Sequence, residues 1–188
     1  MQLTCAQAQY FDRCAKEILS LPLVKSMKRY PQHGKTSCLC HCIMVAKRSY
    51  WLAVRLNQMF GWKINYRAVI RGALLHDFFL YDWHDPNNGH RFHGFSHPYT
   101  AYDEASKYFF LNKRERDVII KHMFPFTPFP PRYLESWIVC AMDKICSLEE
   151  TLKRERPVTL GKSCPLFVRS TAVRSQPEEG SVHAVAGV

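Results

Sequence analysis

Apolar side chains recur every three or four residues over most of this chain, which is the period of an amphipathic helix. In the first such segment, Phe11, Cys14 and Ile18 share one face. The pattern predicts six helices, in residues 5–21, 38–60, 66–79, a segment that begins at 97, 114–124 and 131–155. No segment indicates a strand, so we expect an all-α fold.

Residues that begin and end helices flank these segments. Thr36 or Ser37 can accept a hydrogen bond from the first turn of the second predicted helix, and Asn65 can do so for the helix after it. Asn112 and Glu115 have the spacing of a capping box at the start of the helix in residues 114–124. Gly61 can end the helix in residues 38–60. These signals support the helix boundaries that the apolar pattern predicts.

The last predicted helix carries an apolar stripe, and Asp143 does not lie on its inward face by periodicity alone. The stripe consists of Leu134, Ile138, Ala141, Ile145, Leu148 and Leu152. Beyond this helix the period is lost, and residues 157–188 are rich in Ser, Val, Pro and Gly. We therefore expect one domain in residues 1–156 and a flexible tail in residues 157–188.

Composition and cysteine spacing narrow the class of protein. The N-terminal segment lacks a secretion signal, and no apolar run reaches the roughly 18 residues of a membrane span, so we expect a cytoplasmic protein without membrane contact. The eight cysteines are irregularly spaced, which favours reduced thiols. Cys38, Cys40 and Cys42 on one helix would point in different directions, which does not favour a zinc knuckle.

The net charge of +10 makes nucleic acid a candidate partner. The basic residues are scattered, however, and no nucleic-acid signature or Gly-rich phosphate loop accompanies them. A small anionic substrate accounts for the charge equally well.

Histidines and acids at helix ends or inside apolar helices form the candidate chemistry of the chain. They are His41, His76, Asp77, His97, His122 and Asp143, on five successive predicted helices. A buried carboxylate such as Asp77, inside the run RGALLHDFFLYD, costs several kcal/mol unless it is paired or binds a metal. Imidazole and carboxylate ligands suit Fe, Mn, Zn or Ni. No two of these residues form a local chelate, so a metal site requires the fold to gather them.

The order of these residues, with the phrases LLHD, HPYTAYDEA, IIKHMFP and AMDKICS, resembles the HD superfamily of metal-dependent phosphohydrolases over residues 30–152. The resemblance implies an HD-domain-like helical bundle. It also implies a first divalent ion on His41, His76, Asp77 and Asp143, and a second on Asp77, His97 and His122, with Asp77 bridging. FFLYDW lacks the Gly and Lys frequent after the HD pair, and no GYP signature follows His122. We therefore do not expect the cyclic-dinucleotide activity of the GYP branch.

The activity implied by the resemblance is hydrolysis of phosphomonoesters or phosphodiesters, nucleotides included, by a hydroxide shared between two divalent ions. His76 and Asp77 would be the catalytic residues, and Arg48, Lys144 and His93 are candidate substrate contacts. The partner would be a small anionic phosphorylated substrate. Two alternatives stay open: a di-iron oxygenase of HD type, and a non-catalytic metal-stabilised regulatory or nucleic-acid-binding module.

Overall fold

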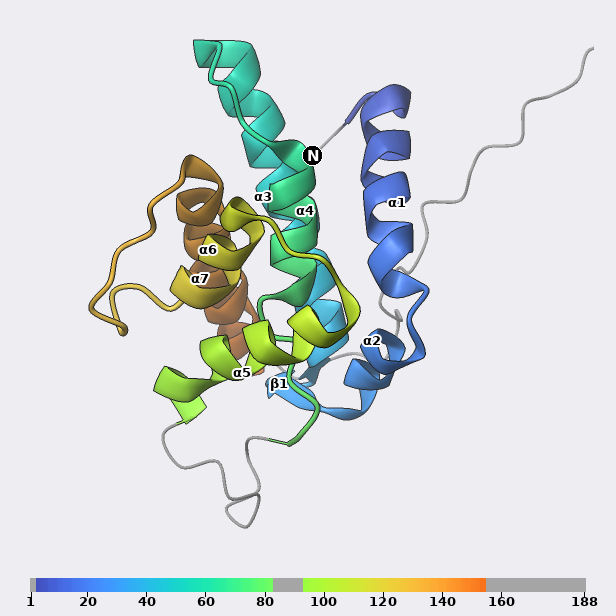
Figure 1. Ribbon diagram of the computed structural model, residues 1–188, viewed down its shortest axis with the longest axis vertical. Coiled ribbons are helices and arrows are strands. Elements are labelled where there is room, and N and C mark those ends of the chain that lie inside the picture. Colours follow the sequence, from blue (N-terminus) through green and yellow to red (C-terminus); the bar gives the residue numbers. More distant parts are fainter. Residues whose placement is uncertain (1–2, 83–92, 155–188) are drawn as a thin grey trace, which may run out of the picture.

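The computed structural model describes residues 3–82 and 93–154, and their fold is all-α, as predicted (Figure 1). The helices are α1 (Cys5–Leu19), α2 (Pro22–Ser26), α3 (Cys38–Phe60), α4 (Tyr66–Leu75), α5 (His93–Tyr108), α6 (Lys113–Lys121) and α7 (Leu134–Arg154), with a short 3₁₀ turn η1 (Met27–Arg29). None of these helices is long and apolar enough to cross a membrane. The predicted tail, residues 157–188, lies outside the described residues.

Helices α3 and α4 pack against each other at the centre of the bundle. Figure 1 shows α1 on one side of this pair, α6 and α7 on the other, and α5 across one end. The interior holds fully buried side chains from the central helices, including Tyr50, Ile70 and Leu74. Burying a large apolar side chain stabilises the fold by about 1.5–3 kcal/mol. The amphipathic pattern of the sequence therefore accounts for the bundle.

The predicted caps are confirmed in the structure. The side chains of Ser37 and Asn65 accept hydrogen bonds from the first turns of α3 and α4, and Asn112 forms a capping box with Glu115 on α6. Gly61 ends α3 with φ of 66°, in the left-handed region that glycine adopts without a steric penalty. Local side-chain chemistry thus fixes where the central helices begin and where α3 ends.

Several predicted helix boundaries are wrong: α1 ends at Leu19 rather than at residue 21, α6 ends at Lys121 rather than at residue 124, and α7 begins at Leu134 rather than at residue 131. Helix α2 was not predicted, and the two largest boundary errors concern α4 and α5. Helix α4 ends at Leu75 rather than at residue 79, because the backbone turns at its C-cap, His76, and the Phe78 amide bonds to the Leu75 carbonyl at 3.1 Å. Helix α5 begins at His93 rather than at residue 97, which places His97 in its second turn. Asp77 consequently lies just beyond a helix instead of inside one.

A small hairpin was not expected from the sequence. Strands β1 (Pro31–His33) and β2 (Thr36–Ser37) pair antiparallel, with His33 opposite Thr36. The prediction that the chain contains no strand is wrong at this point, since strands of two and three residues are too short to show alternation. The hairpin leads directly into α3 and carries its residues to the edge of the cluster described below.

The apolar stripe predicted for α7 does not face the core. Ile138 is buried, but Ile145, Leu148 and Leu152 are each about half exposed. The buried face carries mostly small, polar or charged residues: Glu135, Ser136, Val139, Asp143 and Cys146. The polar groups on this face have partners on neighbouring elements: Glu135 accepts from the Asn65 amide and from Arg114, Ser136 donates to Asp117, and Asp143 contacts His41. Apolar periodicity alone therefore assigns the wrong side.

Gly72 on α4 lies directly against Val118 on α6. A Cβ atom added there would lie 2.7 Å from Cγ1 and 2.8 Å from Cβ of Val118. We expect Gly72→Ala to lower the free energy of unfolding by about 1–2 kcal/mol, because overpacking outweighs the helix propensity gained. Urea unfolding followed by circular dichroism measures this change.

A double-mutant cycle provides the control for Gly72. Val118→Ala removes the 2.7 Å contact with Cγ1 and keeps the 2.8 Å contact with Cβ, so Gly72→Ala should destabilise the protein less in this background than in the wild type. Equal destabilisation in both backgrounds would show that the contact with the Val118 methyl groups is not the cause.

Candidate metal centre

The fold gathers the six candidate ligands into one buried cluster. His41 lies near the start of α3, His97 on α5 and Asp143 in the middle of α7. His76 and His122 are the C-caps of α4 and α6, and Asp77 follows His76 directly. None of the six is more than 6% exposed. Residues from five separate helices or helix ends therefore share one site.

The two C-cap histidines have the same local geometry. Nδ1 of His76 lies 2.8 Å from the carbonyl oxygen of Ala73, and Nδ1 of His122 lies 2.8 Å from that of Ile119. Carbonyls in the last turn of a helix lack intrahelical partners, so each imidazole donates its Nδ1–H to one of them. These bonds leave Nε2 as the atom that faces the cluster and is available to a proton or a metal ion.

The two carboxylate oxygens of Asp77 face two different groups of imidazoles. Oδ2 lies 3.2 Å from Nε2 of His76 and 3.8 Å from Nε2 of His41. Oδ1 lies 3.3 Å from Nε2 of His97 and 3.5 Å from Nε2 of His122. A single carboxylate thus stands between two sets of nitrogen atoms.

Further contacts complete each set. Oδ1 of Asp143 lies 3.0 Å from Nε2 of His41 and 3.5 Å from Nε2 of His76, so Asp143 joins the first set. In the second set, the Nε2 atoms of His97 and His122 lie 2.9 Å apart. Ligand atoms of several such trios lie within 4.8 Å of one another, a spacing that a single ion can span.

The donor set fits a divalent cation. Within the described residues, Nε2 of His76 and Oδ1 of Asp77 are buried and have no hydrogen-bond partner. Leaving such an atom unpaired costs about 1–3 kcal/mol, and a cation between them would remove that cost. Imidazole nitrogen and carboxylate oxygen are ligands of first-row transition metals and zinc. The residues present are therefore suited to hold metal.

The charges in the cluster shift several pKa values. Burial lowers the pKa of His41, but the carboxylates of Asp143 and Glu150 outweigh burial and raise it to about 10. Burial raises the pKa of Asp77, yet the imidazolium of His76 holds it well below its usual range. In His122, burial dominates and lowers the pKa. Without metal, protons on the imidazoles balance the two aspartates, and a cation would replace them.

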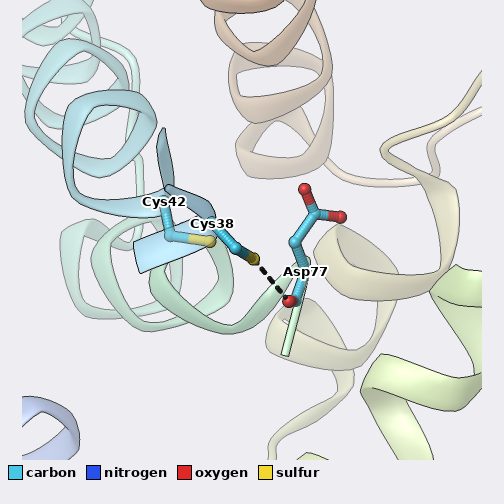
Figure 2. A group of neighbouring side chains, drawn as sticks. All are labelled: Cys38, Cys42 and Asp77. Carbon is cyan, nitrogen blue, oxygen red and sulfur yellow. Dashed lines mark hydrogen bonds between the residues drawn. The ribbon is translucent and has the colours of Figure 1, made fainter. Parts of the chain in front are cut away.

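Two thiols, those of Cys38 and Cys42, lie beside Asp77 (Figure 2), and one carboxylate oxygen of Asp77 is within 4.8 Å of both sulfur atoms. The Cys38 thiol donates to the backbone carbonyl of Asp77 at 3.2 Å. Burial raises the pKa of each thiol, which disfavours the thiolate that a metal needs. Cys38 therefore helps to hold the backbone of Asp77 in place.

A cavity of about 310 Å³ opens onto the cluster. Besides four of the candidate ligands, its walls include Gln32, His33, Met123, Phe126, Lys144 and Ser147. The ammonium group of Lys144 donates to the His122 carbonyl at 2.7 Å, so a positive charge is held at the wall. Lys144, which the sequence suggests as a substrate contact, therefore lines this cavity.

Of the other two candidate substrate contacts, Arg48 lies away from the cavity as the described residues define it. Arg48 pairs with Glu149 through two hydrogen bonds of 2.7 and 2.8 Å and is not among the residues that line the cavity. Its position seven residues after His41 directs it toward α7 instead. His93 begins α5, but its side chain lies outside the described residues.

Two residues at the cluster were not anticipated from the sequence. The Gln32 side chain on β1 donates to Oδ2 of Asp77 at 2.6 Å, and Oε2 of Glu150 lies 3.0 Å from Nδ1 of His41. Glu150 follows Asp143 by seven residues, two helical turns, so a search along that face would have found it. Gln32 lies in a hairpin without periodicity, and no sequence signal marks it.

An all-α bundle with a buried histidine and aspartate cluster defines a helical domain with a potential metal site. The family model of the HD domain matches residues 38–148, which is more than half of the chain, and the chain belongs to this family. The resemblance to the HD superfamily, inferred from the order of the histidines and acids along the chain, is therefore confirmed. HD domain proteins bind divalent metals, and most are metal-dependent hydrolases. Neither the curated proteins nor the solved structures contain a match to this chain.

Proposed function

We propose that this protein is a metal-dependent hydrolase of phosphomonoesters or phosphodiesters, nucleotides included. The observation that carries the proposal is the division of the two Asp77 oxygens between two groups of imidazoles. One divalent ion would be held by His41, His76, Asp77 and Asp143, and a second by Asp77, His97 and His122. Fe, Mn, Zn and Ni all match this ligand set.

Divalent ions bound in such a site polarise phosphoryl oxygens and lower the pKa of water. The chain itself supplies the geometry. Asp77 and His76 would contact the ions at the reacting centre, and backbone hydrogen bonds fix the rings of His76 and His122. The ammonium group of Lys144 beside His122 offsets part of the negative charge of a bound phosphate.

The size and lining of the cavity support a small substrate. A volume of about 310 Å³ is at the low end of the range of about 300–1,000 Å³ that small-molecule sites occupy. The apolar side chains of Met123 and Phe126 lie in the same wall, so an organic group attached to the phosphate has a surface to contact. These features favour a small phosphate ester over a nucleic acid as the partner.

Turnover of simple phosphate esters tests the proposed function. Protein purified without chelator and loaded separately with Mn²⁺, Fe²⁺, Zn²⁺ and Ni²⁺ would be assayed with an aryl phosphate, a diaryl phosphate and a panel of nucleotides. We expect phosphate or aryl alcohol release that a chelator abolishes and added metal restores. If the protein with both ions bound hydrolyses none of these substrates, the proposal is contradicted. An optical signature of a mixed-valent iron pair under air would instead favour an oxygenase.

A further inference from the structure

His41 differs from the two C-cap histidines in the partner of its outer ring nitrogen. His76 and His122 donate Nδ1–H to a free carbonyl at the end of their own helix. His41 lies in the first turns of α3, where the carbonyls already accept intrahelical hydrogen bonds. An imidazole at this position needs a partner from another element to fix its orientation.

Helix α7 supplies that partner in the form of Glu150. Oε2 of Glu150 lies 3.0 Å from Nδ1 of His41, while Oδ1 of Asp143 lies 3.0 Å from Nε2 of the same ring. Asp143 and Glu150 are two turns apart, so one face of α7 contacts both nitrogens of one imidazole. The Glu150 side chain is only 11% exposed and His41 is fully buried, so water screens this contact weakly.

The neighbouring acid, Glu149, has a different environment. Its side chain is 41% exposed and forms its ion pair with Arg48 rather than with a candidate ligand. The two glutamates have the same chemistry and adjacent positions on α7, but only Glu150 contacts the cluster. Glu149 is therefore a matched control for any effect of removing a carboxylate from this part of the helix.

We propose that Glu150 is a positioning residue for the first metal ion. Its carboxylate accepts the Nδ1–H of His41, which orients the ring, fixes Nε2 as the ligand atom and makes that nitrogen a stronger donor. This inference rests on the metal site of the proposed function and adds to it a residue outside the ligand set. Partners of this kind change metal affinity by about 10- to 100-fold in metalloproteins.

Metal affinity measured with the ion alone tests the role of Glu150. Competition of Zn²⁺ or Mn²⁺ between the full chain and a fluorescent chelator would be compared for wild type, Glu150→Ala and Glu149→Ala. We expect Glu150→Ala to weaken the first ion by about 10- to 100-fold and leave the second unchanged. Glu149→Ala should match wild type. Glu150→Gln keeps the side-chain volume and an oxygen that can accept the Nδ1–H of His41, but it loses the charge. It should weaken the first ion less than Glu150→Ala and more than Glu149→Ala, and it tests the inference if the alanine variant does not fold.

A His41→Ala background separates positioning from a general structural role. If Glu150 acts through His41, adding Glu150→Ala to His41→Ala should change the affinity no further. An additional loss in the double variant, or equal losses from Glu149→Ala and Glu150→Ala, would overturn the inference.

The same set of variants distinguishes the failure of this inference from failure of the proposed function. If His41→Ala weakens metal binding and Glu150→Ala does not, Glu150 has no positioning role and the metal site stands. If His41→Ala leaves both affinities unchanged, the assignment of the site itself is wrong, and the role of Glu150 is wrong with it.

Discussion

Replacing Asp77 with Asn should remove both ions and abolish phosphate ester hydrolysis. Asp77 is the one candidate ligand whose two oxygens face both groups of imidazoles. Removing its charge would leave buried cations without their shared partner, a loss of about 3–5 kcal/mol, or roughly two to nearly four orders of magnitude in affinity. Elemental analysis of the purified protein and kcat/KM on an aryl phosphate measure the two effects.

The control for Asp77→Asn is Asp103→Asn. Asp103 is an exposed carboxylate on α5 and belongs to no candidate ligand group. This variant should keep the wild-type metal content and activity. An Asp77→Asn protein that still binds two ions and turns over substrate would contradict the central role assigned to Asp77.

Alanine at His97 or at His122 should reduce the metal content from two ions per chain to one. Both imidazoles face Oδ1 of Asp77, whereas His41, His76 and Asp143 form the other set. Loss of either ring leaves the second ion with two of its three proposed ligands, and we expect its affinity to fall by at least about 100-fold. Metal stoichiometry of protein purified without chelator measures the outcome.

His33 provides the matched control for these histidine variants. It lines the same cavity but belongs to no candidate ligand group, so His33→Ala should retain two ions. A wild-type protein that holds a single ion, with a stoichiometry unchanged by His97→Ala and His122→Ala, would show that the second site does not exist.

The sequence predicts the central helices and the members of the cluster well, for two physical reasons. The helices capped by Ser37, Asn65 and Asn112 begin where local hydrogen bonds form between neighbouring residues. Their starts can therefore be predicted from the sequence without knowledge of the tertiary structure. His76 and Asp77 stand out because ionisable groups inside an apolar run need compensation. The order of the remaining candidates along the chain identifies them through the family.

Features that depend on tertiary contacts are less accessible from the sequence. Apolar periodicity assigns Ile145 and Leu148 of α7 to the interior, but they are exposed, because the inward face carries Asp143 and Glu150. Gln32 reaches Asp77 from a hairpin 45 residues earlier in the chain. Its position depends on how β1 docks against the turn after α4, and no local pattern encodes that docking.

The convergence of candidate ligands from five parts of the bundle would link metal occupancy to the cohesion of the whole core. His41 and Asp143 are 102 positions apart, so an ion shared by them would act as a crosslink that closes a very long loop of the unfolded chain. Since the unfolded chain has no preformed site, binding free energy would be added to folding stability. Any fluctuation that detached one of these helices would also open the coordination sphere, so release of the ion and loosening of the bundle would be one cooperative event.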